Sequence, residues 1–297
     1  MAAFERLKGA ARGERDAAHF NSNDGTWLFT TPLAHLRLSG AHLRARLRRY
    51  LNLTIPVCAG ITLGSGKNAV AADLQGDFAL SVFNGGKAWN NLHNAIRDTI
   101  ATFGRQAGLD VDVEPVRLLR GKDGKVTKSR PADIRIRGAH GWRAAGNREM
   151  WIDVTTISAV CAKHRAKCAE AAGGGSAVAA ANKNGKYVAN MKASGNYGYF
   201  LPLAFESEGY MPNAVSQLLG PWSKLWAEKG GYSPEDAGRR KRIWLNELAH
   251  IHARYVAQAI LDNSKWAREG CIAGKSAEGR APLLSANDAA LPLGFGY

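Results

Sequence analysis

The sequence has little cysteine, no long apolar run and few acidic residues. Its four cysteines, at positions 58, 161, 168 and 271 of 297, form no dense disulfide pattern, so we expect a reducing, intracellular compartment. Because no apolar run reaches the ~18 residues that cross a bilayer, we expect no membrane contact. The first 20 residues lack the apolar stretch of a secretory signal, although they are rich in arginine and alanine, so we favour the nucleus and keep an organelle as an alternative.

The shortage of acidic residues gives the chain a strongly positive charge. Lysine and arginine number 40 against 25 aspartates and glutamates, for a formal charge of +15 and a pI of about 9.9. This charge favours a polyanionic partner, most often nucleic acid. We favour DNA and keep RNA open, since phosphate charge is common to both. The alternatives are a basic surface without such a partner, or a place in a ribosome-type assembly.

Familiar catalytic phrases are also missing. The sequence contains no GxGxxG, no phosphate-binding loop and no nucleophile elbow. The expected strands and helices do not alternate regularly, as they do in a Rossmann sheet. An enzyme acting on small molecules therefore has little support.

Periodicity predicts a layered α/β domain in the middle of the chain. A helix over 89–109 carries an apolar stripe of Leu92, Ile96, Ile100 and Phe103 and stops at Gly108. Strands are expected within 110–119, 132–137, 150–157 and 197–210. Helices are expected over 159–172 and 179–194, separated by a flexible Gly-Gly-Gly-Ser break, and over most of 212–265. This order indicates an α/β fold rather than a helical bundle.

We divide the chain into four parts. Residues 1–56 form a basic N-terminal arm and helix, with Ser39 as the N-cap. Residues 57–88 are glycine-rich and loop-like. Residues 89–210 form the α/β core. Residues 211–297 form a helical extension whose tail, from 270, we expect to be loosely ordered.

Carboxylates on neighbouring strands are the first candidate site. Asp133 and Asp153 can meet at one edge of the sheet, and Glu114, at the end of the preceding strand, can join them. Converging carboxylates are costly unless a cation neutralises them, and hard oxygen ligands suit Mg²⁺ or Mn²⁺. Such a metal can activate water for phosphodiester hydrolysis. The simpler interpretation is two strand-end aspartates in turn or surface contacts.

This arrangement resembles the PD-(D/E)xK nucleases, whose core order is helix, three strands, helix, strand. Pro131-Ala132-Asp133 corresponds to the first part of that motif. Asp153-Val154-Thr155 corresponds to the second, with Thr155 where a lysine is usual.

The region from about Trp27 to about Gly209 resembles a narrower group. In order, its matching stretches are WLFTTPLAHLRLSGAHLRARLRRYLNLTIP, HNAIRDTI, VEP, RPADI, IDVTT, NKNGKY and FLPLAFESEG. Together they are similar to the C-terminal region of non-LTR retrotransposon polyproteins that carry a restriction-enzyme-like endonuclease, most of all the version beside reverse transcriptases in algal and other protist genomes. The resemblance implies a restriction-endonuclease-like core with helical N- and C-terminal additions.

The resemblance also implies a site. Glu114, Asp133 and Asp153 would hold the metal, and a lysine from the following helix would complete the catalytic set of Asp133 and Asp153. That lysine falls on Lys183 or Lys186. Lys192 is a weaker choice, and the alternative is that these lysines only bind phosphates or solvent.

Residues 57–88 resemble the zinc knuckle of that group in a degenerate form. Cys58 remains, but Phe78 stands where a histidine is expected and Val82 where a later cysteine is expected. We therefore expect no zinc here and interpret the segment as held by packing. A second set, Cys161, His164 and Cys168, could share one helical face, but we favour buried cysteines over a metal site.

Basic residues outside the core are candidates for phosphate contacts. The predicted nucleic-acid-binding residues are Arg44, Arg48, Arg49, Lys128 and Arg130, with a solvated helix face as the alternative. Trp222, Trp226 and Trp244 are expected to be core anchors rather than base-stacking platforms.

Two functions follow. The first is a metal-dependent DNA endonuclease of retroelement origin, which nicks DNA with Mg²⁺-activated water. The chain has no Tyr-x-Asp-Asp phrase of a reverse transcriptase, so it would be a fragment, a split subunit or a domesticated copy. Its expected partner is then a separate reverse transcriptase or a large ribonucleoprotein. The second is a non-catalytic nucleic-acid-binding or structural subunit of a large ribonucleoprotein, such as an organellar ribosome.

Overall fold

The structure is a computed structural model. It describes residues 13–272 apart from 23–24, 31, 33, 64–69, 82–86, 117, 120–124, 126–130, 139–140, 143–147 and 194–197. Lys128, Arg130, Val82 and the C-terminal tail therefore lie outside the described residues.

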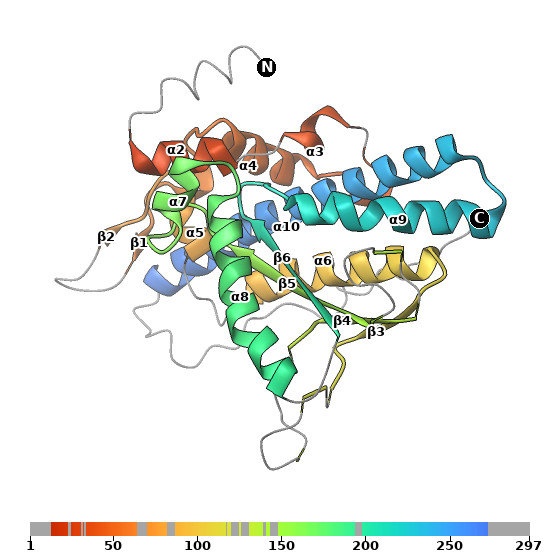
Figure 1. Cartoon of the computed structure of the whole chain (residues 1–297). Coiled ribbons are helices and arrows are strands. Elements are labelled where there is room, and N and C mark those ends of the chain that lie inside the picture. Colours follow the sequence, from red (N-terminus) through yellow and green to blue (C-terminus); the bar gives the residue numbers. More distant parts are fainter. Residues whose placement is uncertain are drawn as a thin grey trace.

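A four-stranded mixed sheet lies at the centre of the fold (Figure 1). Its strands are β3 (Asp110–Val113), β4 (Ile134–Arg137), β5 (Met150–Ile157) and β6 (Tyr199–Glu206), bonded in the order β3-β4-β5-β6. β3, β4 and β5 pair antiparallel, whereas β5 and β6 run parallel. β4 pairs with the first half of β5, while β6 follows β5 along its whole length. The four predicted strands are thus confirmed, β3 and β4 as short ones.

Each face of the sheet packs against a different helix. Ile152 of β5 joins a buried cluster with Ile100 of α6 (Lys87–Gln106). Trp151, the preceding residue, joins a second cluster with Tyr187 of α8 (Gly174–Ala193). Successive residues of a strand point to opposite faces, so α6 and α8 cover opposite faces of β5. The predicted apolar stripe is confirmed, since Leu92, Ile96, Ile100 and Phe103 are all buried.

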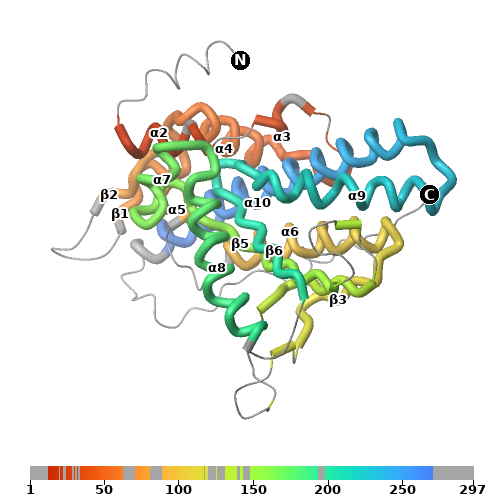
Figure 2. Tube along the Cα trace, in the orientation of Figure 1, coloured from red at the N-terminus to blue at the C-terminus, as the bar shows by residue number. Residues whose placement is uncertain are grey.

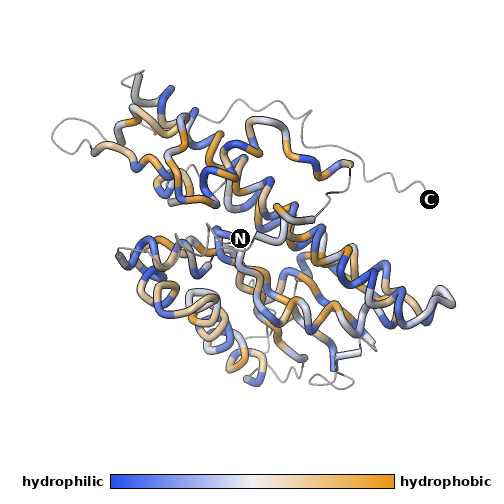
Figure 3. The backbone as a smooth tube through the Cα atoms, turned by 90° about the horizontal axis from the view of Figure 1, so that it is seen from above, coloured by the Kyte–Doolittle hydropathy of each residue, from blue (hydrophilic) through white to orange (hydrophobic). Residues whose placement is uncertain are grey.

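Two long helices complete the main core. α9 (Asn213–Gly230) and α10 (Pro234–Ile272) form a hairpin, and α10 also packs against α6 and α4 (Gly40–Tyr50) (Figure 2). α10 extends beyond the helix expected from the sequence. No described helix is both long and apolar enough to cross a membrane, and Figure 3 shows hydrophilic residues distributed along these helices. The α/β fold class is confirmed as a mixed four-stranded sheet flanked by helices.

The N-terminal elements are short and pack against this core. They are α2 (Glu14–Ser22), α3 (Thr26–Phe29), η1 (Ala34–Leu36), α4, η2 (Pro56–Cys58), β1 (Thr62–Leu63), β2 (Val70–Ala71) and α5 (Asp77–Ser81). The predicted N-cap is confirmed, because Ser39 Oγ accepts the backbone N–H of His42 at 3.4 Å. β1 and β2 form a small antiparallel hairpin in the segment expected to be loop-like. Cys58 and Phe78 are buried in the main core cluster.

The prediction of a flexible break at Gly-Gly-Gly-Ser, residues 173–176, is wrong. Gly174, Gly175 and Ser176 are the first residues of α8, which is one 20-residue helix. The glycines are needed for close approach, since a Cβ on Gly175 would lie 2.6 Å from Cys168 Sγ. Glu206 Oε1 accepts the backbone N–H of Ser176 at 2.8 Å and so binds one of the free N–H groups at the start of α8.

The expectation that Cys161, His164 and Cys168 share one helical face is also wrong. α7 is short, Arg165–Glu170, so Cys161 and His164 precede it in turns. Cys168 is fully buried and donates to Glu206 Oε1 at 3.6 Å. Burial and the neighbouring Glu206 carboxylate together raise the pKa of the Cys168 thiol to about 12, so this sulfur stays protonated at neutral pH.

Candidate active site

Three carboxylate residues lie side by side across β3, β4 and β5. Ile134 of β4 pairs with Val113 of β3 and with Ile152 of β5. The next row of the sheet therefore holds Glu114 after Val113, Asp133 before Ile134 and Asp153 after Ile152. Backbone bonds continue into this row, from Glu114 N–H to Asp133 O at 2.7 Å and from Asp133 N–H to Ile152 O at 2.9 Å. β3 ends and β4 begins beside this row, whereas β5 continues past it. The three acidic residues therefore lie at the edge where the short strands stop.

Asp133 is held from two sides. Its Oδ2 accepts the backbone N–H of Val154 at 2.7 Å, which ties the side chain to β5. Its Oδ1 lies 3.3 Å from Nε2 of His93, which comes from α6. Both contacts fix the direction of the carboxylate without removing it from solvent, since the side chain of Asp133 is 22% exposed.

Asp153 is the buried member of the row. Its side chain is only 6% exposed, and Lys183 Nζ of α8 lies 3.0 Å from Oδ1 and 2.9 Å from Oδ2. The hydroxyl of Thr155 donates to Oδ2 at 3.0 Å. Burial raises the pKa of the Asp153 carboxyl and the neighbouring Asp133 also raises it, while Lys183 and Thr155 lower it, with a net raise.

Glu114 has a different environment. Arg97 of α6 donates to Glu114 Oε1 and also, at 2.8 Å, to Asp98. Glu114 has a φ of +48°, a left-handed conformation that is uncommon for a residue with a side chain. Its side chain is 49% exposed. Arg97 therefore holds α6 against the end of β3.

The two candidate lysines of α8 occupy different positions. Lys183 contacts Asp153, whereas Lys186 is exposed and its Nζ lies 4.9 Å from the ring centroid of Tyr187. Lys183 also lies beside this ring, at 5.6 Å. The structure brings together Asp133, Asp153 and Lys183, and places Lys186 one turn further along the helix.

The donor chemistry of Asp133 and Asp153 fits a hard divalent cation. Both supply carboxylate oxygens, the ligand type of Mg²⁺ and Mn²⁺. The repulsion that helps to raise the pKa of Asp153 is the effect that a bound cation relieves. Within the described part of the chain, however, no group of three or more His, Cys, Asp or Glu side chains is arranged to hold a metal ion. Glu114 is turned toward Arg97.

The predicted phosphate-binding arginines separate into two kinds. Arg44 is exposed, and Arg48 is half-buried and donates to Thr54 O at 2.7 Å. Arg49 is fully buried and pairs with Glu208 and Asp77. Its guanidinium therefore has no exposed surface from which to contact a phosphate. Arg49 was predicted to contact phosphate at the surface. It instead forms two ion pairs that join α4 to α5 and to the end of β6.

His93 is the member of this site that the sequence reasoning left without a role. His93 and Arg97 are four residues apart on α6, so they share one helical face, and that face meets the carboxylate row. The spacing was the available signal, but it does not show which strand the helix faces.

Comparisons with known protein families, with curated proteins and with solved structures find no match to this chain.

Proposed function

We propose that the chain is a metal-dependent nuclease that hydrolyses phosphodiester bonds, with DNA as its first expected substrate and Asp133, Asp153 and Lys183 at its centre. The observation that carries the proposal is the contact of Lys183 from α8 with Asp153, beside Asp133 on the neighbouring strand. The three residues come from positions 133, 153 and 183, so only the fold brings them together.

The order of elements supports the proposal. α6, β3, β4, β5, α8 and β6 follow one another as helix, three strands, helix, strand, with the short α7 before α8. This is the core order of the PD-(D/E)xK nucleases that the sequence resembles. Asp133 precedes the second strand and Asp153 lies within the third. A restriction-endonuclease-like core is therefore the finer fold that we propose.

The origin of the lysine supports it further. The sequence has Thr155 where a lysine is usual, and the resemblance implies that the following helix supplies one. Lys183 of α8 is a lysine in that position, and it contacts the buried carboxylate. Thr155 stands where the lysine is usual, and its hydroxyl donates to the same carboxylate. It would therefore orient Asp153, while Lys183 supplies the positive charge.

Each side chain would have a definite part in the reaction. Asp133 and Asp153 would hold the cation, and His93 and the Val154 N–H would keep Asp133 directed toward it. A bound divalent cation supplies positive charge that stabilises a phosphodiester during hydrolysis and lowers the pKa of water. Lys183 would add positive charge at the scissile phosphate and orient the attacking water by hydrogen bonding.

The test is plasmid nicking with Mg²⁺ or Mn²⁺. We expect the unmodified chain to nick supercoiled plasmid, and Asp133→Ala and Asp153→Ala to lower the rate by a factor of about 100 or more. Asp110→Asn is the matched control, because Asp110 is an exposed carboxylate of the same sheet. Mn²⁺ binding by calorimetry gives a readout apart from activity, and both alanine variants should lose it. Nicking that persists in both variants contradicts the proposal.

One observation favours the second function, a non-catalytic nucleic-acid-binding or structural subunit of a ribonucleoprotein. Every carboxylate of the row already has a protein partner: Arg97 for Glu114, His93 and a backbone N–H for Asp133, and Lys183 for Asp153. A row satisfied in this way can persist without a metal. Salt-sensitive nucleic-acid binding that Asp133→Ala leaves unchanged, without any cutting, would support this second function.

A further inference from the structure

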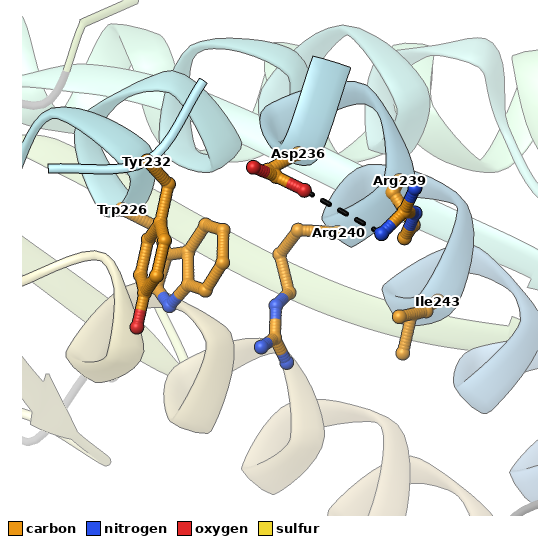
Figure 4. A pocket seen from close by; sticks show the side chains of 6 residues that line it. All are labelled: Trp226, Tyr232, Asp236, Arg239, Arg240 and Ile243. Carbon is orange, nitrogen blue, oxygen red and sulfur yellow. Dashed lines mark ion pairs between the residues drawn. The ribbon is translucent and has the colours of Figure 1, made fainter. Parts of the chain in front are cut away.

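A shallow cavity of about 440 Å³ lies at the tip of the α9–α10 hairpin (Figure 4). It is lined by Trp226, Tyr232, Asp236, Arg239, Arg240 and Ile243. The sequence predicted Trp226 to be a core anchor, together with Trp222 and Trp244. Trp222 and Trp244 are buried, whereas Trp226 is partly buried: it packs against the main core and also faces this cavity.

The aromatic rings here form a stack with a cation. The Trp226 and Tyr232 ring centroids are 4.5 Å apart with planes 15° from parallel, and Arg240 Cζ lies 4.2 Å from the Trp226 ring centroid. Tyr232 is 53% exposed. One face of the Tyr232 ring packs on Trp226, and about half of the residue remains exposed. Figure 4 shows Tyr232 and Arg240 beside Trp226.

Two glycines allow this stack to form. Gly231 ends α9 in a left-handed conformation, with a φ of +69°, which turns the chain back. A Cβ on Gly230 would lie 2.2 Å from Cε2 of Tyr232, so a side chain there would push the ring away. Tyr232 is thus held in place before any ligand binds, which lowers the entropy lost on binding.

Two cations, Arg239 and Arg240, line the cavity beside the stacked rings. Residues 239–242 are four consecutive cations at the start of α10, Arg-Arg-Lys-Arg. Arg239 is exposed, and its Nη1 lies 3.5 Å from Asp236 Oδ1 in an exposed ion pair that a phosphate could replace. Arg240 Nε is buried and has no hydrogen-bond partner among the described residues. A partly exposed aromatic stack with guanidinium groups beside it is a combination that binds single-stranded nucleic acid.

We propose that the tip of the α9–α10 hairpin binds single-stranded nucleic acid. One base packs against the exposed part of the Tyr232 ring, and Arg239 contacts a phosphate of the same strand. Stacking accepts any base, so the site has little sequence preference.

This site is separate from the carboxylate row, although it rests on the proposed nucleic-acid partner. Trp244, one turn after Arg240, donates to Gln106 at the C-terminal end of α6. His93 of the carboxylate site and Gln106 are 13 residues apart on α6, roughly 20 Å along the helix axis. Binding at the hairpin therefore needs neither the carboxylates nor a metal.

The test measures the binding of a fluorescent 12-nucleotide oligothymidylate by anisotropy, in EDTA so that no cleavage occurs. Tyr232→Ala should weaken binding by about fivefold to a hundredfold, the range for the loss of one stacked base. Tyr232→Phe keeps the ring and should stay within about twofold of the unmodified chain. An oligomer of abasic nucleotides should bind both variants equally, because it has no base to stack. Oligouridylate in parallel distinguishes RNA from DNA.

The outcomes are separable from those of the nicking assay. Equal binding of oligothymidylate by Tyr232→Ala and the unmodified chain overturns the proposal, as does an equal loss on the abasic oligomer. Asp133→Ala should bind oligothymidylate like the unmodified chain. If it does so while nicking is absent, the hairpin site stands and the nuclease proposal fails. If nicking is present but Tyr232→Ala binds oligothymidylate normally, the nuclease proposal stands and the hairpin-site proposal fails. A melting curve of each Tyr232 variant shows that it is folded.

Discussion

Lys183 Nζ lies 2.9 Å from Oδ2 of Asp153, a carboxylate that the sheet otherwise buries. An isolated buried carboxylate is costly, and a lysine from the helix across the sheet offsets that cost. Lys183 itself remains 31% exposed, so its ammonium group lies between the buried carboxylate and solvent. In the proposed nuclease, this position would let the ammonium group contact a substrate phosphate and the Asp153 carboxylate at once.

The first prediction separates the two candidate lysines. Lys183→Ala should lower the nicking rate about a hundredfold, because one preorganised charge at the reacting phosphate is lost. Lys186→Ala should have a smaller effect, since Lys186 contacts the Tyr187 ring rather than a carboxylate. The rates are measured on supercoiled plasmid under saturating Mg²⁺. A larger loss in Lys186→Ala would assign the role to Lys186 instead.

The second prediction concerns the contribution of Asp153 to the stability of the folded chain. Its folded pKa is raised above the ordinary value, so the native state binds the proton more tightly than the unfolded state. The stability gained from the protonated form is present at low pH and is lost as the pH rises through the folded pKa. At pH 7 the ionised carboxylate is therefore destabilising. Asp153→Asn should raise the melting temperature at pH 7, as often happens when a costly functional group is removed.

Asp112 of the same sheet is the control, because its pKa is shifted in the opposite direction to that of Asp153. Arg135 and Arg137 hold the pKa of the Asp112 carboxyl below its usual value. Asp112→Asn should therefore lower the melting temperature at pH 7, and this difference should shrink as the pH falls through the folded pKa. Two Asn variants that shift the melting temperature in the same direction at pH 7 would show that the pKa argument is wrong.

Local patterns were enough to predict the strands and the helix before them. The β-branched residues of 150–157 gave β5 with both ends correct, and the four-residue apolar spacing gave the buried stripe of α6. The carboxylate row follows from the same patterns, because adjacent short strands bring their ends together. These elements are predictable since each is specified by its own residues.

Tertiary contacts override such patterns elsewhere. Gly-Gly-Gly-Ser has the composition of a linker, yet Cys168 and Glu206 lie against it and the glycines provide the room. Arg49 belongs to a basic helix that looks exposed, but Glu208 and Asp77, distant in sequence, bury it. In both cases the deciding partner is more than 25 residues away or in another element, where periodicity carries no information.

The third prediction tests the glycines of α8 as a matched pair. Gly175→Ala should destabilise the fold by about 1–3 kcal/mol, because its Cβ would lie 2.6 Å from Cys168 Sγ and 2.9 Å from Ile157 Cδ1. Gly185→Ala, in the same helix but with nothing within 4 Å of its Cβ, should stabilise it by about 0.5–1 kcal/mol. Urea unfolding measures both. A stabilising Gly175→Ala would contradict the close approach of α7 and α8.

The fourth prediction concerns the buried ion pairs of Arg49. Removing Arg49 leaves Glu208 buried without its cation, so Arg49→Ala should lower the free energy of unfolding by about 3–5 kcal/mol, whereas Arg44→Ala, at an exposed position of the same helix, should change it by less than about 0.5 kcal/mol.

The ion pair with Asp77 also predicts the response to acid. Burial alone would raise the pKa of the Asp77 carboxyl, but Arg49 and Arg15 outweigh it and hold the pKa at about 2, below the ordinary 3.8. Because the folded pKa is lowered, the stabilisation is present above the unfolded pKa and is lost as the pH falls from about 4 to about 2. It amounts to roughly 2 kcal/mol. Urea unfolding at pH 7 should show this loss in Asp77→Asn, and the difference from the unmodified chain should shrink toward pH 2. A difference that stays constant over this range would mean that Asp77 contributes through packing rather than through its charge.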